Sequence, residues 1–175
     1  MIYNKIVFKN FSTKYGQLLI GSFDDKLCIC DWYYRKMRNN IDQRIQRILK
    51  AEYAAGTSNV IENTISQLEE YFRKERKIFD IPLVFAGTEF QKKVWNELIK
   101  IPYSQTLTYI QLAETLGDKS AIRAVATANG ANAISIIVPC HRIIGKSGEL
   151  VGYAGGLKAK RDLLELENED KGLFE

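Results

Sequence analysis

The spacing of apolar residues changes after the first third of the chain, and this change limits the folds open to it. Residues 2–9, 17–23 and 26–33 alternate apolar and polar side chains or run apolar, with Gly16 and the Asp24–Asp25 pair at the turns. This pattern is typical of an antiparallel meander. Further along, apolar residues recur every three or four positions, as helices require. We therefore predict an α+β protein: a small N-terminal antiparallel sheet with helices, then a mostly helical part.

Two helices are expected after the meander, and a new pattern starts near residue 87. Asn40 is predicted to begin a helix that Gly56 closes, and a second helix is predicted over residues 60–77. The glycine and threonine that follow residue 86 then open a new amphipathic pattern. We expect a supporting α/β domain over residues 1–86 and a second domain over residues 87–175.

Capping signals mark the predicted helix starts in the second half. A Thr followed three residues later by Gln occurs at 88–91 and at 108–111, and Ser120 is expected to cap a helix over 121–129. The last helix is predicted over residues 157–168. The two short helices after residue 108 are joined by a tight, glycine-containing turn, which matches a helix-turn-helix.

The predicted helix at 121–129 consists mostly of Ala, Val and Thr, with Arg123 as its one long cation. Small side chains suit either tight packing in a core or close approach of the helix backbone to DNA. The chain carries a net charge of +4, but 6 of its 21 acidic side chains and only 1 of its 25 basic ones fall in residues 162–175, so residues 1–161 carry +9. An excess of this sign indicates a polyanionic partner and favours the DNA interpretation.

Cys140 and His141, the only histidine, stand together after an apolar run at 134–138. We predict that this run is a short buried strand ended by Pro139. A thiol is a nucleophile as its thiolate, and a neighbouring imidazole is a common means of forming it. The plainer interpretation is a small buried hydrophobic residue beside a core histidine. From the pair alone, acyl transfer, redox chemistry and metal binding all stay open.

The other cysteines and the overall composition exclude several classes. Cys28 and Cys30 lie two apart on one expected strand, a spacing that suits neither a disulfide nor a zinc knuckle, so we predict buried small residues and no metal. No apolar stretch approaches the roughly 20 residues of a membrane span. The N-terminus alternates like a strand rather than a signal segment, so we expect a cytoplasmic protein without membrane association.

Seven segments with consistent spacing carry a family resemblance. They are residues 87–95 (GTEFQKKVW), 101–103 (IPY), 109–113 (YIQLA), 123–125 (RAV), Asn132, 137–142 (IVPCHR) and 152–156 (GYAGG). With these motifs the chain resembles the methylated-DNA-protein-cysteine methyltransferases, also called O6-alkylguanine-DNA alkyltransferases. The resemblance implies a ribonuclease H-like N-terminal domain and a C-terminal domain with a winged helix-turn-helix.

The resemblance also implies an activity: the direct, single-turnover transfer of an alkyl group from O6 of a flipped guanine to a cysteine. Cys140 matches the acceptor. His141 matches the group that activates the thiol through a bridging water, and Glu167 matches the residue that orients the histidine. An oriented base beside a nucleophile agrees with general principles of covalent catalysis.

Further roles follow from the same motifs. Tyr109 matches the donor to the leaving guanine oxygen, Arg123 the side chain that replaces the flipped base in the stack, and Asn132 the hinge between the helix and the cysteine segment. The remaining expected DNA-binding residues are Thr108, Ser120, Ala121, Ala124 and Arg142, and the expected substrate-binding residues are Tyr153, Ala154, Gly155, Ser135, Val138 and Pro139.

The implied partner is double-stranded DNA carrying O6-alkylguanine, with O4-alkylthymine as a second candidate lesion. We expect a monomer without a cofactor. The chain departs from the family pattern at Ser104, where Gly is usual, and at Ala133, where Pro often follows the hinge. The alternatives are a non-catalytic module that binds alkylated DNA, a helix-turn-helix regulator and a Cys-His hydrolase, and the acceptor cysteine argues against the first of them.

Overall fold

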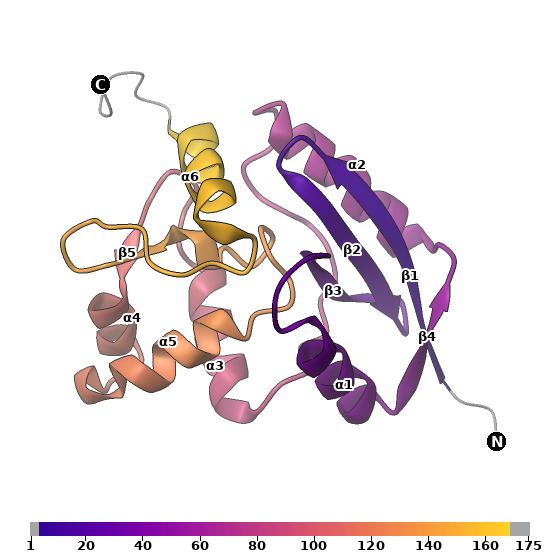
Figure 1. Ribbon diagram of the computed structural model, residues 1–175, viewed down its shortest axis with the longest axis horizontal. Coiled ribbons are helices and arrows are strands. Elements are labelled where there is room, and N and C mark those ends of the chain that lie inside the picture. Colours follow the sequence, from indigo (N-terminus) through magenta and orange to yellow (C-terminus); the bar gives the residue numbers. More distant parts are fainter. Residues whose placement is uncertain (1–3, 169–175) are drawn as a thin grey trace.

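The computed structural model describes residues 4–168, and Figure 1 shows a sheet with two helices beside the helices of the second half of the chain. The first half contains strands β1 (Asn4–Thr13), β2 (Gly16–Phe23), β3 (Lys26–Trp32) and β4 (Ala51–Ala55), with helices α1 (Arg38–Leu49) and α2 (Asn59–Phe72). The second half contains α3 (Glu89–Ile99), β5 (Leu107–Thr108), α4 (Tyr109–Thr115), η1 (Lys119–Ala121), α5 (Ile122–Gly130), η2 (Cys140–Arg142), β6 (Ile143–Ile144) and α6 (Gly156–Glu167).

The meander is confirmed, but the sheet is mixed rather than antiparallel. Strands β1, β2 and β3 pair antiparallel as predicted, while β4 lies parallel to β1 at its other edge, in the order β3-β2-β1-β4. The prediction of a helix through Tyr53 was wrong. Lys50 has φ of 49°, in the left-handed region, which ends α1, and the next residues pair with the free edge of β1.

Alternation along the strands builds two cores, one on each face of the sheet. On one face, Leu18 and Ile20 pack with the second half of the chain in the larger core. On the other face, Leu19 and Ile29 pack with Ile41 of α1 in the smaller one. Because the larger core includes buried side chains from α2, α3, α4, α5 and α6, the sheet supports the helices of the second half directly. The predicted boundary between residues 86 and 87 stays a prediction.

Two capping boxes were predicted correctly, at Thr88 with Gln91 and at Thr108 with Gln111. Each satisfies two backbone N–H groups at a helix start, an effect worth about 1 kcal/mol. The cap at Ser120 was wrong: the Asp118 carboxylate accepts from the Ser120 N–H at the start of η1, and α5 begins at Ile122.

Other boundaries also differ from the prediction. Met37, not Asn40, is the N-cap residue of α1, and α2 starts after Ser58, whose hydroxyl accepts from the Ile61 N–H, and ends at Phe72 rather than residue 77. No helix within residues 4–168 has the length and apolar character needed to cross a membrane.

The segment before Cys140 is a tight loop and not the predicted strand. It touches the sheet in a single bridge, where the Cys30 N–H donates to Ala133 O at 2.9 Å and the Ser135 N–H donates to Cys30 O at 2.7 Å. Ile136 has φ of 73°, which no extended strand allows. The loop is thus hydrogen-bonded to the outer edge of β3, so contacts with the first half of the chain help to fix the position of the cysteine.

Candidate active site

Cys140 begins η2 directly after the loop. Its N–H donates to Val138 O at 2.8 Å, and the residue is 3% exposed. Ile136, a β-branched residue in the left-handed region, is a strained position of the kind that clusters at functional sites. Burial raises the pKa of the Cys140 thiol, and a hydrogen bond with Asn132 acts in the opposite direction. The resting group is therefore a thiol, which needs a base to become a nucleophile.

The other two cysteines are buried in the sheet, as predicted. Burial raises the pKa of Cys28 to about 12 and raises that of Cys30 further from its usual value. Both are therefore inert thiols packed in the core. Within the part of the chain that the structure describes, no group of three His, Cys, Asp or Glu side chains is placed to hold a metal ion.

His141 is fully buried and forms a close pair with Glu167 of α6. His141 Nε2 lies 2.7 Å from Glu167 Oε1. Burial lowers the pKa of His141, so the ring is neutral near pH 7. An ionised carboxylate only accepts hydrogen bonds, so Nε2 carries the hydrogen and Nδ1 holds the free lone pair. Nδ1 has no hydrogen-bond partner among the described residues, which leaves it available as a base.

Glu167 stays ionised because several donors surround it. Burial alone raises the pKa of Glu167, but hydrogen bonds from His141 and Arg142 and the charge of Arg142 outweigh that effect and hold the pKa well below its usual range. Arg142 donates twice, through Nε to Oε2 and Nη2 to Oε1, both at 2.9 Å. The Tyr71 hydroxyl donates to Oε1 at 2.7 Å, and the Ser104 N–H donates to Oε2 at 3.3 Å.

Arg142 was expected to contact DNA at the surface, but it lies inside the protein. It is 5% exposed, and its third hydrogen bond runs from Nη1 to Ile101 O at 2.6 Å. A buried guanidinium whose hydrogen bonds are all within the protein cannot bind a DNA phosphate, so the expected role of Arg142 as a DNA-binding residue was wrong. Its role here is to neutralise Glu167 and fix the orientation of the carboxylate.

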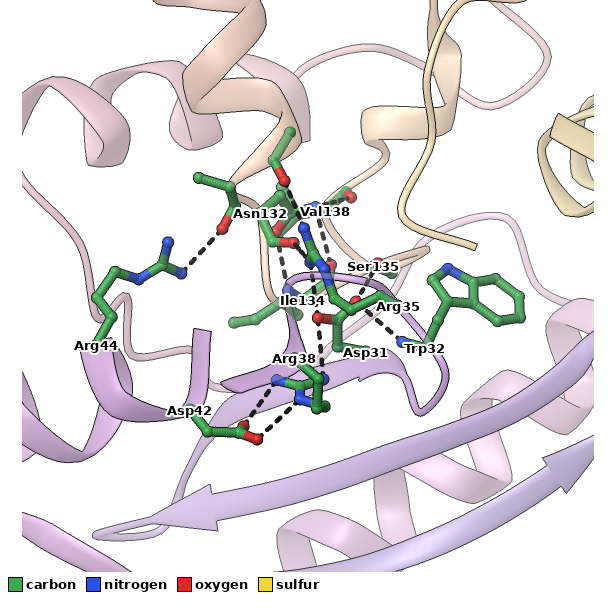
Figure 2. A network of polar contacts seen from close by, with 12 residues as sticks. Asp31, Trp32, Arg35, Arg38, Asp42, Arg44, Asn132, Ile134, Ser135 and Val138 are labelled. Carbon is green, nitrogen blue, oxygen red and sulfur yellow. Dashed lines mark hydrogen bonds and ion pairs between the residues drawn. The ribbon is translucent and has the colours of Figure 1, made fainter. Parts of the chain in front are cut away.

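Asn132 ties the end of α5 to the cysteine loop, where a hinge was expected. Its side chain accepts from the Ile134 N–H at 2.9 Å and donates to Val138 O at 2.9 Å (Figure 2). Asn132 is 2% exposed. A short amide that bridges backbone groups on both sides of a loop fixes the shape of that loop.

Cys140 lines a pocket of about 600 Å³ that is open at one side. Tyr109 from the start of α4 and Asn129 from α5 form part of its wall, and Tyr153 with its neighbours forms another part. A cavity of this size is typical of sites for small molecules or single nucleotides. The full lining is Tyr34, Arg35, Lys36, Met37, Tyr109, Ala126, Asn129, Gly130, Cys140, Gly152, Tyr153, Ala154, Gly156 and Leu157.

Tyr109 reaches across the pocket toward the loop after residue 150. Its hydroxyl donates to Val151 O at 3.3 Å. Burial first, and then the charge of a Cys140 thiolate, raise the pKa of Tyr109, so the hydroxyl keeps its proton and stays a donor. The buried Lys160 ammonium, from α6, donates to two carbonyls of the same loop, Val151 O at 2.9 Å and Gly152 O at 3.3 Å. The lysine holds this wall of the pocket, and burial lowers its pKa to about 8.

Several expected substrate-binding residues do not line the pocket. Ser135, Val138 and Pro139 are buried and outside the lining. Gly155 packs against Trp32, where a side-chain Cβ would lie 2.5 Å from the indole. Tyr153 and Ala154 do line the pocket, as expected.

The remaining expected DNA-binding side chains lie just before α4 and along η1 and α5. Arg123, Ala124 and Ser120 are exposed, and Thr108 and Ala121 are partly exposed. The inner side of α5 packs against α3 and α4, where the Trp95 indole N–H donates to Ala128 O at 2.8 Å. One side of α5 therefore packs against the core, while its small, exposed side chains leave the helix backbone accessible on the other side.

Sequence reasoning missed residues that reach the site from the first half of the chain. Tyr71 contacts Glu167 across 96 positions, and Tyr34 and Arg35 border the pocket. It also missed Lys160. No local pattern marks such contacts, because they depend on how the sheet packs against the second half.

Comparisons with known proteins show that the chain is similar to O6-methylguanine methyltransferases. Residues 89–169 match the family model described as 6-O-methylguanine DNA methyltransferase, DNA binding domain. The chain is 56% identical over 101 residues to a methylated-DNA–protein-cysteine methyltransferase of Methanosarcina acetivorans, covering 58% of this chain and 65% of the relative. It is 48% identical over 101 residues to an inducible one of Bacillus subtilis, covering 58% of this chain and 56% of the relative. These matches thus cover less than two thirds of the length of each relative.

The structural similarity extends over nearly the whole chain. The crystal structure of Mycobacterium tuberculosis OGT in complex with DNA matches with a TM-score of 0.80 and 36% identity, covering 92% of each chain. An O6-methylguanine-DNA methyltransferase of Pyrococcus kodakaraensis, at 21% identity and a TM-score of 0.67, has the same fold.

Proposed function

The chain belongs to the family of methylated-DNA–protein-cysteine methyltransferases, and on that premise we propose that it repairs DNA by moving the alkyl group of O6-alkylguanine onto Cys140. The observation that carries the proposal is the thiol at an open pocket with the neighbouring His141 held by Glu167 at 2.7 Å. The resulting thioether is stable, so each molecule acts once and Cys140 is a consumed co-substrate.

In the proposed reaction, a bond forms between Cys140 Sγ and the alkyl carbon as the bond from that carbon to guanine O6 breaks. The electron pair of the broken bond stays on the guanine. The thiol proton moves through a water to His141 Nδ1, the free lone pair of the ring. Glu167 supports the imidazolium that forms, as the carboxylate does in other nucleophile–histidine–acid arrangements. The net result is S-alkylcysteine and guanine, which takes up the proton given up by the thiol, so that His141 ends neutral again.

Tyr109 is the proposed donor to the guanine oxygen. Negative charge grows on that oxygen as the bond breaks, so a donor aimed at it stabilises the transition state more than the ground state. The raised pKa of Tyr109 supports this role, because the hydroxyl must be protonated when the substrate binds.

A guanine can reach Cys140 only outside the stack, because a base within a duplex is covered on both faces. We propose that α5 enters a groove of double-stranded DNA and that the exposed Arg123 takes the place of the extruded base. Thr108, Ser120, Ala121 and Ala124 would contact the backbone along the same side. Tyr153 and Ala154 would hold the base in the pocket, over a floor kept in place by Ser135, Val138, Pro139 and Gly155.

Finer assignments belong to the same proposal. They are a ribonuclease H-like first domain over residues 1–86, a winged helix-turn-helix in residues 87–175, a monomeric protein acting in the cytoplasm, and O4-alkylthymine as a second lesion. Support for the helix-turn-helix comes from α4 and α5, which follow one another through η1 and pack together, and β5 and β6 form a two-stranded ribbon beside them.

The test is incubation with duplex DNA that contains one O6-methylguanine, followed by mass spectrometry of the peptide with Cys140. We expect one methyl group per protein molecule and no second turnover. Cys140→Ala should bind the same duplex without reacting. Tight binding by the wild-type protein with an unmodified Cys140 would instead favour the non-catalytic binding module, and multiple turnover would contradict an acceptor that is used once.

A further inference from the structure

Three backbone carbonyls at the end of α5 are held by arginines from the first half of the chain. Arg35 Nη2 donates to Gly130 O at 2.6 Å, and Arg35 Nη1 donates to Asn132 O at 2.9 Å. Arg44 Nη2 donates to Ala131 O at 2.9 Å. The last carbonyls of a helix lack partners within it and carry partial negative charge, so cations stabilise them. Figure 2 shows Arg35 and Arg44 reaching this helix end from separate places.

The buried carboxylate of Asp31, at the end of β3, holds Arg35 in place. Asp31 is 0% exposed, and its Oδ2 lies 2.7 Å from Arg35 Nη1. Its Oδ1 accepts from the Trp32 N–H at 2.9 Å and from the Ser135 hydroxyl at 3.2 Å. A buried charge is tolerated only where its partners keep their geometry. Asp31 therefore fixes Arg35 and the cysteine loop relative to each other (Figure 2).

From Arg35 the contacts lead to the reacting residue in few steps. Arg35 holds Asn132 through its carbonyl, and the Asn132 side chain donates to Val138 O at 2.9 Å. The same Val138 O accepts from the Cys140 N–H at 2.8 Å. Arg35 and Gly130 also line the pocket beside Cys140. One arginine is thus connected to the end of α5, to the proposed hinge and to the pocket wall.

We propose that Asp31 and Arg35 are positioning residues for alkyl transfer, which keep the end of α5 and the cysteine loop in the arrangement that places Cys140 for attack. The first half of the chain then sets the reaction rate without touching the reacting atoms. The kinetic part of this inference rests on the proposed function; the structural part does not.

The experiment compares Arg35→Met and Arg35→Lys with the matched control Arg38→Met. Arg38 also contacts Asp31, at 3.2 Å, but its other partner is Asp42 of α1. The control thus removes a guanidinium from the same carboxylate and leaves the carbonyls at 130–132 untouched. Two measurements are made on each protein: amide hydrogen exchange over residues 130–142, and the single-turnover rate of methyl transfer at saturating duplex DNA.

We expect Arg35→Met to speed exchange at the loop amides and to lower the transfer rate between about 10-fold and 100-fold, since small displacements of reacting groups have effects of that size. The affinity for the duplex should change less than about threefold, because α3 and α4 still support α5. Arg35→Lys should be intermediate, since an ammonium lacks the planar fork that spans two carbonyls. Arg38→Met should stay within about twofold of the wild-type rate.

Wild-type exchange and rate in Arg35→Met would overturn the proposal, and so would an equal loss in Arg38→Met, which would indicate general destabilisation. If Arg35→Met does not fold, Arg35→Lys decides, because unchanged exchange and rate in that variant would also refute the role. A wild-type protein that transfers no methyl group contradicts the proposed function instead. In that case the exchange comparison still tests the positioning.

Discussion

His141 Nε2 and Glu167 Oε1 lie 2.7 Å apart, with side chains 0% and 1% exposed. The carboxylate also receives two hydrogen bonds from Arg142 and one from Tyr71. This pair decides which ring nitrogen of the histidine is free, and it joins α6 to the residues beside the cysteine. Both catalysis and stability should therefore depend on it.

Replacing Glu167 with Gln should lower the free energy of unfolding by about 3 kcal/mol, because Arg142 would be left buried without its counter-charge. The methyl-transfer rate should also fall, since an amide supports the imidazolium poorly. Urea unfolding and single-turnover kinetics measure the two effects. Glu165→Gln, an exposed position on the same helix, is the control and should match the wild type in both. A Glu167→Gln protein as stable as the control would contradict the ion pair.

Stability should fall on acidification between pH 7 and pH 4. The pKa of His141 is lowered on folding from its usual 6.5, and that of Glu167 is lowered from 4.5. In both cases the unfolded chain binds protons more readily, so the stability is present above the usual pKa and is lost as the pH falls below it. Urea midpoints at several pH values measure this.

Glu62 offers the control for the acid range. It is an exposed carboxylate whose pKa is also lowered, through hydrogen bonds with Lys9 and Thr57. Glu62→Gln should leave the pH dependence almost unchanged, because exposed pairs contribute little. A stability that is constant from pH 7 to pH 4 would show that His141 does not have the environment described. The contribution of Glu167 is lost only below its usual pKa of 4.5, so its test is a further fall in stability below that pH.

Tyr109→Phe should slow methyl transfer by about 10-fold to 100-fold, since it removes the proposed donor to the leaving oxygen. Stability should change little, because the hydrogen bond from the hydroxyl to Val151 O is long, at 3.3 Å. The single-turnover rate and the thermal midpoint check both statements. Tyr33→Phe, at a residue that is 50% exposed, serves as the control. An unchanged rate in Tyr109→Phe would remove the tyrosine from the mechanism.

Asn132→Ala should lower the free energy of unfolding by about 2 kcal/mol, because the Ile134 N–H and Val138 O lose buried partners. The methyl-transfer rate should fall as well, since the cysteine loop loses its cross-link. Denaturant unfolding and kinetics test this, with the exposed Asn40→Ala as the comparison. If Asn132→Ala reacts at the wild-type rate, the loop does not need the amide to keep its shape.

The cysteine loop shows where prediction from the sequence failed. An apolar run entering a proline satisfied every local rule for a buried strand, yet Ile136 turns back at φ of 73°. The loop keeps that shape through Asn132, Ser135 and the edge of β3. Similarly, residues 51–55 continued a helical pattern, but the open edge of β1 took them as a parallel strand.

The sequence by itself determined what depends on neighbours along the chain. The capping boxes at Thr88 and Thr108 and the adjacency of Cys140 and His141 involve residues at most three positions apart. The antiparallel meander joins strands that follow one another through short turns, so local geometry decides it too. The tertiary structure alone decided that Arg142 faces Glu167 and that Arg35 holds Asn132 across 97 positions. Such contacts form because buried charges must find partners once the core has closed, and no local pattern specifies which partner lies within reach.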